Sequence, residues 1–423
     1  MSKLIIILTV LLISACGSPP APSDTPTRDA SAPTSPAPHA TDAPLDVPPS
    51  VSAPAPALTV TQSHQLPLDQ PWVLIGETLV AVRDDGMITQ LDVPVSDVII
   101  APDGSPVIIV HPDTSGYALR NTQTWTDLPL ALPDGLMVQG GALLAPDGGH
   151  LAIPAWSQTD RFLVFIVNSA TGAVRARISG TGDDPPTPLA WRGRQLFTHT
   201  QSSATSSFWR TDVAAQAPQP QEFLLVGHTG PWAMAPNGTA LVWSYSGRPL
   251  YLRDLDTGVD YVLRDDPYAY VAPLISPDSA TLALLQERGS SGCCELLFFD
   301  IKKRPPAPIA QAMRIDSPFM SMRGQVGWAW SPDSARLLVI TSSQLLLLTP
   351  GGAVVGQVSR PSAPAVESFR LTADDRALLV TRNEPDAALR IIALTGDAAG
   401  SVTEVRLPAS EGSYAVVYAP EAK

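Results

Sequence analysis

A short turn recurs along the chain, each time ahead of a run of apolar residues. In its fullest form it reads Ser-Pro-Asp-Ser at 276–279 and at 331–334, with the apolar runs Leu282–Leu285 and Leu337–Ile340 behind it. Proline presets φ for the first central position of a turn, and Asp, Asn or Gly suits the positions that follow. A turn of this kind between two short apolar runs predicts a β-hairpin.

The copies of this turn are regularly spaced. Its Asp or Asn position, or the counterpart in Thr-Ala-Asp-Asp, is filled by Asp103, Asp147, Asn237, Asp278, Asp333 and Asp374. The gaps are 44, 90, 41, 55 and 41 residues. The gap of 90 is a doubled period, because Ala190–Gly193 at its midpoint is a degenerate copy ahead of Gln195–Phe197. Self-similarity at a fixed period indicates a repeat architecture.

A second pair of strands is expected in each period, after the hairpin. Examples of the apolar runs that indicate it are Leu163–Val167, Leu250–Asp254, Leu296–Asp300, Leu345–Leu348 and Leu389–Ala393. The repeat region shows no sustained helical pattern with caps. Four strands in about 40–45 residues make a propeller blade. The predicted fold class is therefore all-β, a β-propeller of four-stranded blades preceded by a disordered tether.

The number of blades depends on the two ends of the repeat region. The turns and the degenerate copy account for seven blades. Four further apolar runs remain, at Trp72–Ile75, Thr78–Val82, Met87–Leu91 and Tyr414–Tyr418. Together they predict an eighth blade built from both ends of the chain, which would close the ring and remove free sheet edges. We expect eight blades, with seven as the alternative.

The turns also resemble those of a known family. Ser-Pro-Asp-Ser and Ala-Pro-Asp-Gly followed by Leu-Ala or Leu-Leu resemble the WD-like repeats of TolB-type propellers, and Gly227-His228 ahead of Trp232 resembles the Gly-His step of WD repeats. The resemblance covers residues 97 to about 395. It implies a propeller that makes protein contacts in the cell envelope, although this architecture serves many functions.

The first residues read as an export signal. Lys3 precedes the apolar run Leu4–Ile13, which is too short to span a bilayer but has the length of a signal-peptide core. Ile-Ser-Ala-Cys at 13–16 resembles the lipobox of bacterial lipoproteins. That resemblance implies removal of residues 1–15 and acylation of Cys16. The alternative is an ordinary secretory signal that contains a cysteine.

Residues 16–58 are predicted to be a disordered tether, ahead of a propeller domain at 59–423. Twelve prolines fall in 17–58, among Ser, Ala and Thr. Such a segment buries too little apolar surface to offset its ordering entropy, and proline extends it. The chain is expected to be exported and lipid-anchored to the outer face of the cell membrane, or to the outer membrane if the host has two membranes.

The charge and the cysteine content limit the classes of partner that the protein is expected to bind. A net charge of −13 argues against nucleic acid, because binding to phosphate requires a basic surface. The expected contacts are the membrane, through the lipid, and a protein or peptide partner, with the chain as a monomer. Besides Cys16 the chain has only Cys293 and Cys294, which are adjacent. They form either a vicinal disulfide or two free thiols, and no spacing supports a four-ligand zinc site.

Nothing in the sequence indicates catalytic chemistry. The six histidines have no metal-binding spacing, and no Gly-x-Ser-x-Gly elbow, Walker loop or Rossmann fingerprint is present. The repeated turn carboxylates are interpreted as turn caps. We therefore expect no cofactor or metal and a non-catalytic binding scaffold. Two alternatives remain: a propeller enzyme with channel residues that act on a glycan or peptide, and a substrate-capture protein for a transporter.

Tryptophans offer the most specific candidate for a contact surface. Most of the nine are expected to pack between blades, but Trp328-Ala-Trp330 places two indoles on the same face of one strand. That pair is the predicted binding surface. Weaker candidates near blade turns are Trp156, Arg161, Trp191, Arg192 and Arg194.

Overall fold

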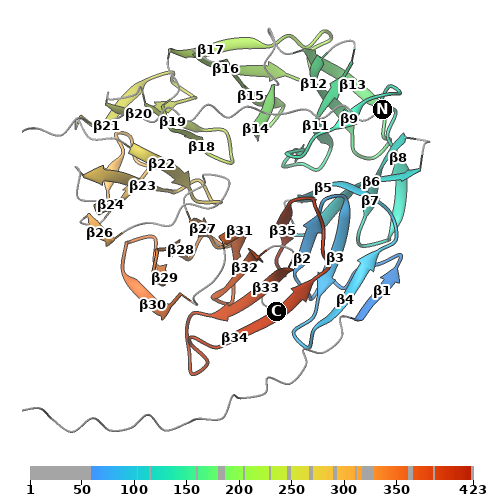
Figure 1. Ribbon diagram of the computed structural model, residues 1–423. Coiled ribbons are helices and arrows are strands. Elements are labelled where there is room, and N and C mark those ends of the chain that lie inside the picture. Colours follow the sequence, from blue (N-terminus) through green and yellow to red (C-terminus); the bar gives the residue numbers. More distant parts are fainter. Residues whose placement is uncertain are drawn as a thin grey trace, which may run out of the picture. The chain divides into compact units, whose positions relative to one another are not determined.

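A computed structural model describes residues 59–420, apart from 102, 114–115, 159–160, 180–185, 203–204, 228–229, 245–248, 266–269, 289–292, 310–311, 317–326, 361–364 and 384–385. The described residues form eight β-sheets around one axis, an eight-bladed propeller (Figure 1). This confirms the predicted fold class and the count of eight blades. The signal peptide, Cys16, the tether and His228 lie outside the described residues, so the predictions about them stay predictions. No helix in the described part of the chain is long and apolar enough to cross a membrane.

Seven blades are built from strands that follow one another in sequence. Blades 2 to 4 consist of β5 (Val95–Ile100), β6 (Pro106–Asp113), β7 (Gly116–Asn121) and β8 (Thr126–Pro129); β9 (Met137–Val138), β10 (Leu143–Leu144), β11 (His150–Ser157), β12 (Arg161–Asn168) and β13 (Val174–Ser179); and β14 (Thr187–Arg192), β15 (Gln195–Gln201), β16 (Thr205–Asp212) and β17 (Gln221–Gly227).

Blades 5 to 8 continue the ring. They consist of β18 (Trp232–Met234), β19 (Ala240–Ser244), β20 (Leu250–Asp254) and β21 (Asp260–Arg264); β22 (Tyr270–Ile275), β23 (Thr281–Arg288), β24 (Cys293–Asp300), β25 (Ala307–Pro308) and β26 (Met313–Asp316); β27 (Trp328–Trp330), β28 (Leu337–Ile340), β29 (Gln344–Leu348) and β30 (Val354–Ser359); and β31 (Ala365–Leu371), β32 (Arg376–Asn383), β33 (Asp386–Ala393) and β34 (Val402–Leu407). In blades 2 and 4 to 8 the first strand is the inner one, and in blade 3 the inner position is shared by β9 and β10, which both pair with β11. The additional strand β26, which pairs with β24, accounts for part of the 55-residue period of blade 6.

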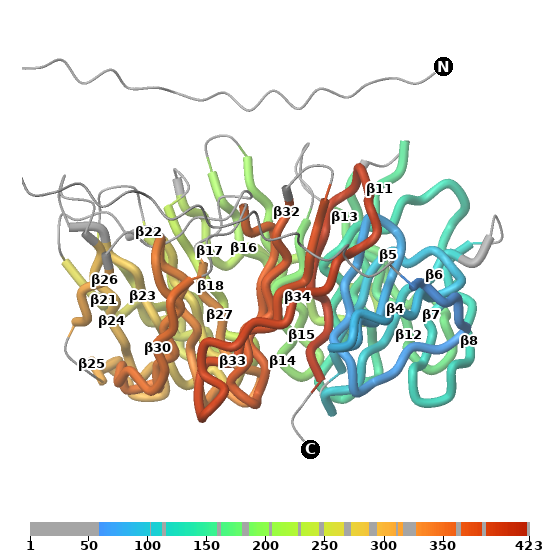
Figure 2. Tube along the Cα trace, turned by 60° about the horizontal axis from the view of Figure 1, so that its bottom comes forward, coloured from blue at the N-terminus to red at the C-terminus, as the bar shows by residue number. Residues whose placement is uncertain are grey.

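Blade 1 joins the two ends of the described chain, as the four leftover apolar runs predicted. Its sheet order is β35 (Tyr414–Tyr418), β2 (Trp72–Ile75), β3 (Thr78–Val82), β4 (Met87–Leu91) and β1 (Thr59–Ser63), with β35 innermost. Figure 2 shows the red C-terminal strands beside the blue N-terminal ones. The outermost strand β1 was not predicted. It pairs with β4 in parallel, and four of its five residues are exposed.

The core is divided among the blade interfaces. Each of eight apolar clusters joins two neighbouring blades, so the eight clusters cover all eight interfaces of the ring. Side chains alternate along a strand. On β23, Leu282 and Leu284 pack toward blade 5, whereas Ala283 and Leu285 pack toward blade 7. Because both faces of a blade are buried, its second strand reads as a continuous apolar run, which is the pattern seen after each turn.

The repeated turn has a left-handed residue in its fourth position. Its members are Gly104, Gly148, Gly238, Ser279, Ser334 and Asp375, with φ between 58° and 81°. Just before it, Asp103, Asp147, Asn237, Asp278 and Asp333 each accept the N–H group two residues further on, at 2.8–3.1 Å. Asp374 instead forms an ion pair with Arg376 at 2.8 Å. These side chains therefore bond within their own turns.

Two of the left-handed residues are serines, which also join neighbouring turns. The Ser279 hydroxyl accepts the Asn237 N–H at 3.2 Å, and the Ser334 hydroxyl accepts the Asp278 N–H at 2.9 Å. A non-glycine residue in this conformation is strained by about 1 kcal/mol. We infer that the bond between blades offsets that strain.

Substitutions at Ser334 test this balance. Ser334→Ala keeps the strain but loses the bond to Asp278, so we expect a loss of about 1–2 kcal/mol in the free energy of unfolding. Ser334→Gly loses the same bond but relieves the strain, and we expect a change of less than about 0.5 kcal/mol. Chemical denaturation of both variants measures the difference. Equal destabilisation by alanine and glycine would contradict the explanation.

Candidate functional site

The inner strands enclose a cavity in the centre of the ring. Its volume is about 1010 Å³, and its described lining comes from blades 5 to 8, 1 and 2. The contributing strands are β18, β22, β27, β31, β35 and β5 (Figure 1). Residues as distant in sequence as Ile100 and Ala419 thus share one space because the ring is closed.

The cavity lining is apolar and rich in rings. Aromatic side chains reach it from Trp232, Trp328, Trp330, Phe369 and Tyr418. The turn prolines Pro236, Pro277 and Pro332 line it as well, because in blades 5 to 7 the turn directly follows the inner strand. Large, rigid ring surfaces and proline faces can hold apolar groups of a ligand without losing much side-chain entropy.

Trp328 and Trp330, the predicted binding surface, lie in this lining but are mostly buried. Their exposed fractions are 7% and 8%, and both belong to the apolar cluster between blades 6 and 7. The Trp330 Nε1–H donates to the Leu274 carbonyl at 3.4 Å. Only an edge of each indole is therefore open to a ligand, and their role as a contact surface stays a prediction.

The weaker candidates do not belong to the described lining of the cavity. Trp191 is buried between blades 3 and 4, and its Nε1–H donates to the Leu143 carbonyl at 3.1 Å. Arg192 forms an ion pair with Asp256, and Arg194 lies 3.6 Å from Asp212.

Two further candidates sit in blade 3. Trp156 is on β11, half-buried, opposite Phe162 on β12. The side chain of Arg161 lies outside the described residues. Neither residue belongs to the described cavity lining.

The two adjacent cysteines lie at the start of β24 in blade 6. Cys294 is buried in the cluster between blades 6 and 7. The side chain of Cys293 lies outside the described residues, so the vicinal disulfide stays a prediction.

Polar residues of the inner strands bind the backbone of the next blade. The Asp97 carboxylate of β5 accepts the N–H groups of Gly141 and Ala142 at 2.9 and 2.8 Å, and burial raises its pKa. The Ser368 hydroxyl of β31 accepts the Val416 N–H at 3.1 Å. Each of these residues directly follows an irregularity in the pairing of its inner strand.

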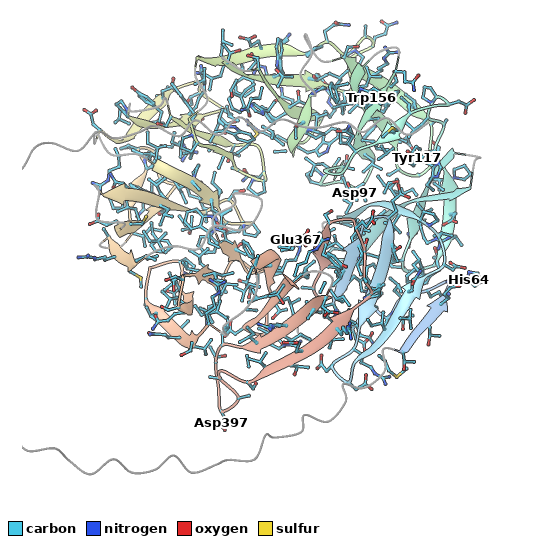
Figure 3. All side chains as sticks on the ribbon, in the orientation of Figure 1. His64, Asp97, Tyr117, Trp156, Glu367 and Asp397 are labelled. Atoms are coloured by element: carbon cyan, nitrogen blue, oxygen red, sulfur yellow. The ribbon has the colours of Figure 1, made fainter. Side chains whose placement is uncertain are left out.

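Glu367 adds a third bond of this kind, from β31 to the closing strand β35. Its carboxylate accepts the Tyr414 N–H at 3.1 Å. Figure 3 shows Asp97 and Glu367 on the inner side of the ring. Asp97 and Glu367 are therefore engaged in joining blades.

Arg370 of β31 is the charged residue in the described lining of the cavity. Its Nε–H donates to the Val416 carbonyl at 2.7 Å, and burial lowers the pKa of the guanidinium. No histidine or carboxylate belongs to that described lining. Over the described residues, no group of three or more His, Cys, Asp or Glu is placed to hold a metal ion. The described lining thus provides apolar contact, ring edges and one cation.

Sequence reasoning missed Arg370, although a signal was present. Arg370 lies between Phe369 and Leu371, directly before the turn at Thr372, where the inner strand of a blade is expected to be apolar. A charge at that place in the repeat is out of pattern. Whether it faces the cavity depends on strand register, which the repeat alone does not determine.

Comparison with known proteins supports the propeller fold of the chain. No protein-family model matches the chain, and no curated protein matches it in sequence. Among solved structures, the dihydro-haem d1 dehydrogenase NirN in complex with DHE is similar with a TM-score of 0.55 at 11% identity, over 84% of this chain and 76% of that one. At this identity the likeness shows the propeller fold alone.

Two further structures are less similar in shape. Hsv2 of Kluyveromyces lactis has a TM-score of 0.47 at 12% identity, over 76% of this chain and 99% of that one. A protein assigned as TolB from Agrobacterium tumefaciens has a TM-score of 0.35 at 12% identity, over 56% of this chain and 88% of that one.

His199 supports one of the aromatic residues of the cavity. It lies on β15 and is 4% exposed, with its ring 4.8 Å from that of Phe208 and 4.5 Å from that of Trp232. Its Nε2 has no hydrogen-bond partner among the described residues. Burial lowers its pKa from 6.5 to about 4. The imidazole is therefore neutral in the folded protein above about pH 4.

This burial predicts a pH dependence of stability. Between pH 6.5 and 4 the unfolded chain binds a proton at His199 that the folded protein does not, so stability falls as pH falls through this window. From pH 7 to 4.5 the contribution is about 2–3 kcal/mol. We expect His199→Phe to show a correspondingly smaller loss in the same window, measured by urea denaturation at both pH values. An unchanged pH dependence in the variant would disprove this assignment.

Proposed function

We propose that this chain is an exported, lipid-anchored lipoprotein whose propeller binds a protein or peptide partner in its central channel without catalysing a reaction. The observation that carries the proposal is the central cavity of about 1010 Å³, lined by rings and prolines. Such linings are typical of binding sites, in which aromatic residues supply much of the contact energy.

The N-terminal sequence supports the location. An apolar run followed by Ile-Ser-Ala-Cys at 13–16 suits export and acylation of Cys16. In an extended, proline-rich conformation, residues 16–58 would span roughly 130 Å at most. A tether of that reach would let an anchored propeller meet partners well away from the bilayer surface.

The chemistry of the described cavity supports binding over catalysis. General acid–base or nucleophilic catalysis needs titratable or nucleophilic groups placed together. The nearby acidic side chains Asp97 and Glu367 instead accept backbone N–H groups of neighbouring blades.

Capture of a substrate for a transporter is the second candidate. The observation that favours it is the size of the cavity, which lies at the upper end of the range for small-molecule sites. The two candidates differ in what is captured, a protein or a small molecule.

An obstructed channel tests the proposed function. Ala419 lines the cavity just after β35, at the edge of the apolar cluster between blades 8 and 1, so Ala419→Arg adds a long side chain to the cavity. Ala399→Arg is the matched control, because Ala399 is exposed in the β33–β34 turn. In cross-linked pull-downs from intact envelopes, we expect wild type and Ala399→Arg to capture the same partner, and Ala419→Arg to lose it.

Two results would count against this function. One is equal capture by Ala419→Arg and the wild type. The other is the absence of any captured partner at low and at high salt. Recovery of a small molecule in place of a protein would favour the transporter candidate.

Labelling tests the anchor separately. With radioactive palmitate, we expect the wild-type chain to be labelled and to sediment with membranes, because Cys16 is the acylation site. Cys16→Ala removes that thiol, so the label should be lost. A variant that is still labelled would disprove acylation at Cys16.

A further inference from the structure

Arg370 places a cation in the aromatic cavity, and it has no acidic partner among the described residues. Arg370 lines the cavity together with Phe369, Tyr418, Trp328 and Trp330. Its side chain has access to the solvent of the cavity. Its one hydrogen bond among the described residues goes to the carbonyl oxygen of Val416.

The described acidic residue on the same strand is engaged elsewhere. Glu367, on the same strand, accepts the Tyr414 N–H and lies 4.0 Å from Arg382. By contrast, many other arginines of the described chain pair with a carboxylate, as in Arg120–Asp127, Arg304–Asp254, Arg376–Asp374 and Arg390–Glu404. The chain has 40 acidic residues against 27 basic ones, so an unpaired arginine in its centre is not explained by a shortage of acids.

The geometry of the bond to Val416 leaves a defined recognition surface. It uses the Nε–H, so the end of the guanidinium, with its two Nη groups, remains for another acceptor. Two parallel N–H groups match the two oxygens of a carboxylate. The Arg370 side chain is exposed to the solvent of the cavity, so its Nη groups are open to an anion that enters.

We propose that the central cavity binds a ligand whose single carboxylate pairs end-on with Arg370 while its apolar, ring-bearing body lies against Trp328, Trp330 and the turn prolines. This inference rests on the proposed function of the channel as the binding surface. A volume of about 1010 Å³ leaves room for a body well beyond the carboxylate.

A carboxylate fits better than a phosphate. The described lining provides one cation, whereas phosphate sites usually gather several donors or a helix N-terminus. The net charge of −13 also opposes a dianion more than a monoanion. Both a free organic acid and the C-terminus of a polypeptide carry the required group.

Matched pairs of probes test the inference. The first pair is 1-naphthylacetate and 1-naphthylacetamide, and the second is N-acetyl-Phe-Phe with a free or an amidated C-terminus. Each probe is titrated calorimetrically into the full chain held in lipid nanodiscs, with empty nanodiscs as the blank. We expect the acid of at least one pair to bind about tenfold more tightly than its amide.

Variants of Arg370 test whether this residue causes the preference for the acid over the amide. Arg370→Gln removes the charge but keeps a donor for Val416, so we expect the acid to bind only as well as the amide, with the affinity for the amide unchanged. Arg370→Lys keeps the charge but lacks the two parallel N–H groups of the guanidinium, so it should retain part of the preference for the acid. Arg194→Met, at an exposed site outside the cavity, should bind as the wild type does.

Three results would overturn the inference: equal binding of acid and amide by the wild type, an unchanged acid preference in Arg370→Gln, and no binding of any probe. Binding of both members of a pair without preference would leave the channel as a binding surface and remove the role of Arg370. A preference confined to the naphthyl pair identifies a free acid as the ligand type, and one confined to the dipeptide pair identifies a polypeptide C-terminus.

Discussion

The antiparallel pairing of β35 with β2 closes the ring, and both the interface between blades 8 and 1 and the central cavity depend on it. Each blade buries apolar residues on both faces, so an open ring would leave one face of blade 1 and one of blade 8 in water. Side chains of β31 add to the closure, since Ser368 accepts the Val416 N–H and Arg370 donates to the Val416 carbonyl. The closing strand is thus held from β2 by backbone pairing and from β31 by side chains.

The parts of the fold that could be predicted are those that local sequence determines. The turn acts locally through φ preferences and side-chain bonds, so the blades could be counted from the spacing of the turn, and the leftover apolar runs indicated the joint blade. Strand β1 gave no such signal, because Thr59–Ser63 is held by backbone pairing to β4 and not by apolar burial. The environments of Arg370 and His199 were not predicted for another reason. Their environments come from strands of other blades, distant in sequence, and no local pattern encodes that proximity.

The pair Trp328 and Trp330 shows how strand alternation can be read correctly while burial is misjudged. The two indoles do share a face, but that face packs against blade 6. Both faces of an inner strand belong to blade interfaces, and the channel meets mainly the strand edges. An aromatic stripe on such a strand is therefore chiefly core, and only its margins are open to a ligand. A charged residue such as Arg370 departs from this rule, which makes it more informative about recognition than the tryptophans are.

A propeller can carry such a residue because its stability does not come from its centre. The eight apolar clusters lie between blades, so the axis can stay hollow and accessible to solvent. In a dry central core an unpaired guanidinium would cost several kcal/mol. In a solvent-filled channel part of that cost is avoided, and a ligand carboxylate can replace the water. The division of the core into interfaces, which follows from apolar residues on both faces of each blade, is thus the physical condition for a charged recognition site on the axis.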